Sequence, residues 1–172
     1  MKGVSIMKKQ RKEKTEQTIT LRLWTFDAAK KAVPYIRSLV QSLRDHWLEV
    51  RMVQVEAERL KARPGRLDHQ ALIEIEESDR RLQQAAANVE GVVDEMMPLS
   101  AFGVDPAAGL TVLPFFRGDV LAWLVFDLFD PRGLVAWRLH SDDLDTRRPL
   151  SELDQPPSET EVAQSPPDTA RS

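Results

Sequence analysis

The side chains best suited to chemistry lie in one short segment near the carboxyl end of the chain. It reads Arg138-Leu-His-Ser-Asp-Asp-Leu-Asp145 and continues to Arg147 and Arg148. Carboxylates and an imidazole in one run are ligand types that metal ions accept. The spacing lacks the glycine and the distal glutamate of a calcium loop, however. We therefore interpret the acidic run as a solvated turn, and we predict no metal and no cofactor.

The arginines of this segment suggest a different kind of site. Guanidinium groups bind phosphates and carboxylates through paired hydrogen bonds. Asp127 ends the preceding apolar run and could approach Arg138 if the two runs form adjacent antiparallel strands. We favour a structural ion pair, because an unpaired charge in an apolar sheet is costly. The alternative is a small-ligand or anion site, and its candidate residues are Asp127, Arg138, His140, Arg147 and Arg148.

No other motif predicts catalysis. The chain has no cysteine, which excludes a thiolate nucleophile, a thiolate metal site and a disulfide framework. It also has no phosphate-binding glycine loop and no recognisable serine–histidine–aspartate spacing. We therefore predict no catalytic residues and favour a protein that is not an enzyme.

Length and charge indicate one domain with polar ends. A chain of 172 residues with a net charge of −3 has no strong attraction for nucleic acid or an anionic membrane. We predict a disordered basic tail over residues 1–20, a single domain over 21–150, and a disordered proline-rich acidic tail over 151–172. Its longest apolar run is far shorter than the roughly 20 residues of a membrane span. We expect a soluble cytoplasmic protein, with nucleic-acid binding by the basic tail as a weak alternative.

Apolar residues between positions 25 and 61 recur at steps of four and three, which predicts an amphipathic helix with a coiled-coil seam. Thr25 is suited to cap its start, and Pro34 should bend it. Trp47 should lie in the core. The seam residues are Ala29, Val33, Ile36, Val40, Leu43, Trp47 and Val50.

A second helix with the same spacing is predicted over residues 67–97, after a turn at Pro64-Gly65. Asp79 fills the one polar position of its seam. Two long helices joined by a short loop should pack as an antiparallel hairpin. Such a pair leaves apolar edges that the rest of the chain, a second copy or a helical partner must cover. The apolar seam residues are Leu72, Ile75, Leu82, Ala86, Val89, Val93 and Met96.

The remainder of the domain is rich in β-forming residues. Strands are predicted at about residues 110–113, 120–129 and 134–140, with turns at Gly118 and at Pro131-Arg-Gly133. The fold class is therefore α+β, a long antiparallel helical hairpin followed by a three-stranded antiparallel meander. One face of the sheet should pack on the helices, and a loop, a tail or a partner should cover the other.

Three stretches resemble a bacterial family catalogued as domain of unknown function 2203. They are Trp24-Thr-Phe-Asp-Ala-Ala-Lys-Lys-Ala-Val-Pro34, Gly109-Leu-Thr-Val-Leu-Pro114, and a group formed by Val120-Leu-Ala-Trp123, Trp137 and Arg147-Arg-Pro-Leu150. The resemblance covers residues 23–150 and implies a fold but no known activity.

The chain departs from the pattern of that family at its most reactive residue types. Val112 stands where the pattern has aspartate, Ala122 where it has cysteine, and Arg138 where it has histidine, and Phe126-Asp127 replaces a glycine–glutamate pair. A reactive site in the family would thus be lost or altered here. We therefore favour a noncatalytic interaction or structural module that uses its hairpin for self-association or partner binding. The alternative is a ligand site or enzyme on the sheet around Arg138.

Overall fold

The computed structural model describes residues 20–154 of the chain. The two disordered tails predicted from the sequence lie outside these residues, apart from residue 20 and residues 151–154. The elements are α1 (Phe26–Lys61), α2 (His69–Met96), the 3-10 helix η1 (Met97–Leu99), β1 (Phe102–Asp105), β2 (Leu110–Arg117), β3 (Val120–Asp127), β4 (Leu134–Leu139) and the 3-10 helix η2 (Leu150–Asp154).

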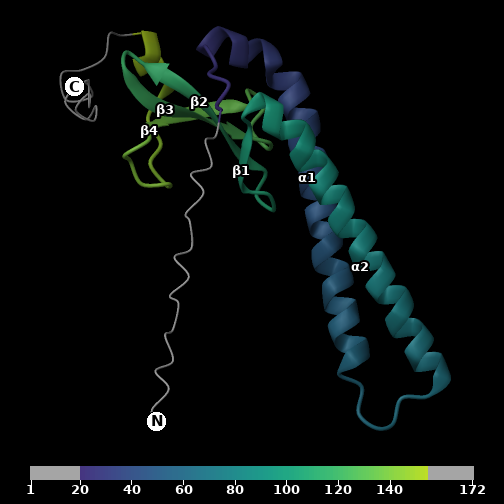
Figure 1. Ribbon diagram of the computed structural model, residues 1–172. Helices are drawn as coiled ribbons and strands as arrows, with labels where there is room; N and C mark the ends of the chain where they lie inside the picture. The colour runs from purple at the N-terminus through teal and green to yellow at the C-terminus, as the bar shows by residue number, and fades with distance from the viewer. Residues whose placement is uncertain (1–19, 155–172) are drawn as a thin grey trace, which may run out of the picture.

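The predicted helical hairpin is confirmed, with helix ends within two residues of those expected. The Thr25 hydroxyl accepts a hydrogen bond from the backbone N–H of Ala28 at 3.2 Å and caps α1. Asp68 caps α2 in the same way through the N–H of Ala71 at 2.8 Å. Pro34 lies inside α1, and the first turns of that helix run at an angle to the rest (Figure 1). Each cap satisfies a backbone donor that the helix itself leaves unpaired.

The contact between the two helices buries only part of the apolar surface of α2. On α2 the buried side chains are Ser78, Ala85, Val92 and Met96. The stripe predicted from the sequence lies partly beside this seam, since Leu72 is 52% exposed and Val93 is 40% exposed. Apolar side chains on α2 are therefore left at the edge of the hairpin.

The sheet is a four-stranded antiparallel meander in the order β1-β2-β3-β4. The three predicted strands are present, and β1 adds a fourth at one edge. It pairs Phe102 with Val112 and Gly103 with Thr111, and a register shift follows before Asp105. β1 pairs only with β2 in this sheet and is therefore an edge strand.

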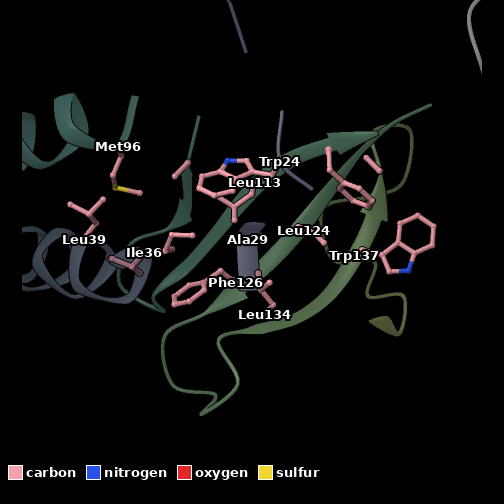
Figure 2. Packing of buried hydrophobic residues seen from close by; sticks show 14 of the residues in the cluster. Trp24, Ala29, Ile36, Leu39, Met96, Leu113, Leu124, Phe126, Leu134 and Trp137 are labelled. Carbon is pink, nitrogen blue, oxygen red and sulfur yellow. The ribbon is translucent and has the colours of Figure 1, made fainter. Parts of the chain in front are cut away.

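One face of the sheet packs on the first half of α1 and the last turns of α2. The side chains of this core include Ile36, Leu113, Phe126 and Trp137, all of them fully buried (Figure 2). The lower part of the hairpin projects away from the sheet (Figure 1). A smaller cluster of Val112, Val125 and Ala136 lies apart from this core. No helix among residues 20–154 is long and apolar enough to cross a membrane.

Candidate functional site

The register of the last hairpin separates Asp127 from Arg138. Arg138 lies opposite Trp123, while the N–H of Asp127 donates to the Gly133 carbonyl at 2.8 Å and closes the hairpin. Four residues of strand, at about 3.3 Å each, separate Asp127 from Trp123 along β3. The ion pair expected from the sequence therefore does not form. The Asp127 carboxylate instead accepts from the N–H of Phe129 at 2.8 Å and orders the turn.

The other four candidates lie on β4 and on the segment that follows it, which folds back onto the strand. The Trp137 N–H donates to the Arg148 carbonyl at 3.0 Å, and the Arg148 N–H donates to the Trp137 carbonyl at 2.8 Å. Residues 139–147 therefore form a loop that returns to the strand. The strand residue Arg138 is only 6% exposed.

Asp142 organises this loop, although its acidic run was expected from the sequence to be a solvated turn. Its carboxylate accepts from Arg148 Nε at 2.8 Å and Arg148 Nη2 at 3.0 Å. It also accepts from the N–H of Leu139 at 2.8 Å. The hydrogen bonds from Arg148 are the largest cause that lowers the pKa of Asp142, and burial opposes them. The Asp142 carboxylate is therefore paired with Arg148.

Arg148 also contributes to a stack around Trp137. The guanidinium of Arg117 lies 4.8 Å from the centre of the Trp137 ring and that of Arg148 lies 5.2 Å from it. The indole N–H donates to the Pro149 carbonyl at 3.1 Å, and Arg117 Nη2 donates to the Glu152 carbonyl at 2.8 Å. Cations over an indole face are stabilising. These contacts attach residues 148–152 to the sheet, which gives Arg148 a structural role.

Arg138 differs from Arg148 because it forms no ion pair with an acidic side chain of the described residues. Its Nη1 donates to the carbonyls of Leu139 at 3.3 Å and Asp142 at 3.4 Å. Among residues 20–154, no carboxylate oxygen lies within 4.0 Å of its guanidinium. Burial is the main cause that lowers its pKa. The charge of Arg147 lowers it further, and that of Asp142 raises it.

His140 is exposed at the end of the same sheet face. Its Nδ1 accepts a hydrogen bond from Trp123 Nε1 at 3.0 Å. The indole of Trp123 is in turn held edge-on by Phe102, with ring centres 6.0 Å apart. Because Nδ1 is an acceptor here, the proton of the neutral ring lies on Nε2. The imidazole therefore presents a donor on its other side.

A second feature is an apolar groove where the hairpin meets β1. Trp47, expected in the core, is 37% exposed at this groove, because the α1 seam turns toward α2 through Leu43 and Val53 and leaves the indole on the flank. The volume of the groove is about 250 Å³. The lining residues are Leu43, Trp47, Val89, Val93, Met96, Met97, Ala101, Phe102, Gly103 and Pro106.

Within the described residues, no group of three histidine, aspartate or glutamate side chains could hold a metal ion. A family model described as "Uncharacterized conserved protein (DUF2203)" matches residues 22–150, which confirms the resemblance seen in the three sequence stretches. No curated protein and no solved structure gives a significant match to the chain.

Proposed function

The chain belongs to the DUF2203 family, whose description names no activity, and we propose that it is a noncatalytic self-association module. The hairpins of two copies would pack side by side as a four-helix bundle. The observation that carries this proposal is the apolar edge of the hairpin that residues 20–154 leave uncovered. Helices of a bundle bury such edges against one another.

The apolar face of α2 consists of three rows, each with a spacing of seven residues. One row, with Ser78, Ala85 and Val92, is buried against the rest of the chain. The middle row, with Ile75, Leu82 and Val89, is half-buried. The third row contains Leu72, Asp79, Ala86 and Val93. A face of three positions per heptad is typical of a helix that packs on more than one neighbour.

Helix α1 completes the same edge of the hairpin. Trp47 lines the apolar groove together with Val89 and Val93 of α2. On the opposite flank Arg81 pairs with Glu56 at 3.1 Å across the two helices, near the exposed side chains of Met52 and Val55. We assign the partner surface to the side with the apolar groove, where both helices contribute apolar side chains. A second copy fits this surface because it offers an edge with the same heptad spacing.

Sedimentation equilibrium over a range of concentrations up to about 1 mM, the weak end of protein affinities, tests the proposal. We expect the wild-type chain to form dimers and Val93→Glu to remain monomeric, because a glutamate would be buried in the interface. The matched control is Met52→Glu, since Met52 is 73% exposed on the outer side of α1, and it should still dimerise.

Circular dichroism melting shows whether each variant folds, so that a lost dimer is not confused with a lost fold. A wild-type chain that stays monomeric throughout the range would contradict the proposal. Equal dissociation of both variants would contradict this choice of surface.

A further inference from the structure

The strongest unexplained charge in the described structure belongs to Arg138. Its side chain is almost wholly buried, yet its hydrogen bonds are two long ones from Nη1 to main-chain carbonyls. Within residues 20–154, Nε and Nη2 have no protein acceptor. They are also not among the fully buried unpaired atoms, so they touch solvent. A desolvated cation with free donors favours the approach of an anion.

Arg147 supplies a second cation beside the first, because the antiparallel bridge between Trp137 and Arg148 places residues 138 and 147 next to each other. Its Nη1 is held by the carbonyls of Leu144 at 2.7 Å and Thr146 at 2.9 Å, which leaves its Nε and Nη2 without acceptors in the described region. The charge of Arg147 acts more strongly on Arg138 than that of Asp142 does. Asp142 is already paired with Arg148. Over residues 138–148 the three arginines are balanced by Asp142, Asp143 and Asp145, so the site depends on the free donors of Arg138 and Arg147 rather than on a net positive charge.

We propose that Arg138 and Arg147 bind a phosphate-class oxyanion at the end of β4, beside the loop of residues 139–147. Trp123 lies opposite Arg138 in the sheet and donates to His140 Nδ1, so the side chains of Arg138 and His140 are on the same side of the sheet. Trp123 fixes the imidazole so that Nε2 serves as a further donor. Donors from three separate side chains match a tetrahedral oxyanion better than a planar carboxylate, which a single guanidinium binds with two hydrogen bonds.

Calorimetric titration of the full chain with inorganic phosphate, against chloride at equal ionic strength, tests the site. We expect Arg147→Ala to weaken phosphate binding about tenfold, the effect of losing about 1.4 kcal/mol. Arg147 is exposed, so its loss should leave the fold intact. The matched control is Arg132→Ala, an exposed arginine whose guanidinium pairs with Asp130, and it should bind phosphate normally.

A second variant tests the buried arginine without removing its charge. Arg138→Lys should fold and bind phosphate more weakly, because lysine lacks the planar fork of donors. Glycerol phosphate, titrated in parallel, separates the two sources of the ligand. Tighter binding of the ester indicates a phosphoryl group on a larger molecule, and equal binding indicates the free ion. The proposal is overturned if phosphate binds no better than chloride or if Arg132→Ala weakens binding as much as Arg147→Ala.

Discussion

Asp142 and Arg148 form a paired hydrogen bond, with 2.8 Å from Nε to Oδ2 and 3.0 Å from Nη2 to Oδ1. The same carboxylate accepts the N–H of Leu139, the last residue of β4. One side chain therefore joins the end of the strand to the point where the chain returns to it. The position of Arg138 under the loop depends on this closure, and so does the proposed oxyanion site.

Asp142→Asn should lower the free energy of unfolding by about 1.5–3 kcal/mol at neutral pH, the usual contribution of hydrogen bonds to charged groups. The pKa of Asp142 is lower in the folded chain than its ordinary value of 3.8, chiefly through Arg148. Its stabilising effect is thus complete above that ordinary value and is lost as the pH falls through the folded pKa. Urea unfolding at several pH values should show the difference between the two proteins shrinking below about pH 4. The same difference at acid and neutral pH would contradict this assignment.

Two glycines should respond to alanine with opposite signs. Gly109 has φ +69°, and an added Cβ would lie 2.6 Å from Leu128 Cβ. Gly109→Ala should therefore lower the free energy of unfolding by more than about 1 kcal/mol. Gly91 lies in α2 with nothing within 4 Å of an added Cβ, so Gly91→Ala should raise it by about 0.5–1 kcal/mol. Urea unfolding measures both, and a shared sign would show that the backbone argument is wrong.

The helices were predictable from the sequence because their apolar spacing is regular over many turns. β1 was not, because Phe102-Gly-Val-Asp105 is only four residues long, contains a glycine and is followed by Pro106. Only Phe102 in this strand is even half-buried. A strand at the edge of a sheet thus leaves little hydrophobic alternation for a sequence pattern to reveal.

The candidate site was predictable in composition but not in pairing. Four of its five residues lie in the segment that the sequence singled out. The strand register was not predicted from the sequence, and in the observed register Arg138 lies opposite Trp123 and not near Asp127. The pairing of Trp137 with Arg148 across eleven residues, which turns an acidic stretch into a closed loop, was also not predicted. Asp142 could have been found only from the general rule that an arginine near an apolar strand needs an acceptor.

Trp24→Phe should test how the segment before α1 is attached to η1. The indole N–H donates to the Leu99 carbonyl at 2.8 Å, and the Trp24 backbone N–H donates to the Pro114 carbonyl at 2.8 Å. Phenylalanine keeps most of the packing but leaves the Leu99 carbonyl without the indole donor. We expect a loss of about 1–3 kcal/mol in the free energy of unfolding, measured by urea unfolding. A change below about 0.5 kcal/mol, the size of a neutral surface substitution, would show that water replaces the indole donor.

Asp79→Leu should strengthen self-association with little effect on the monomer. Asp79 pairs with Lys61 across the hairpin at 2.7 Å, but both side chains are about half exposed. Such a pair contributes only about 0–1 kcal/mol to stability. The substitution would complete the apolar row of Leu72, Ala86 and Val93, and Lys61 can extend its amine into water. Burying a leucine is favourable by about 1.5–3 kcal/mol, so the dimer should form at least about tenfold more tightly.

Glu77→Leu is the matched control, because Glu77 is an exposed residue outside the three apolar rows of the same helix. It adds the same side chain but should leave the dimer dissociation constant from sedimentation equilibrium unchanged. If Asp79→Leu does not tighten the dimer, or if Glu77→Leu tightens it equally, the row that contains Asp79 is not the interface. In the proposed dimer, the charge of Asp79 would limit the strength of association while it fixes the register of the helices, as a polar seam residue does in coiled coils.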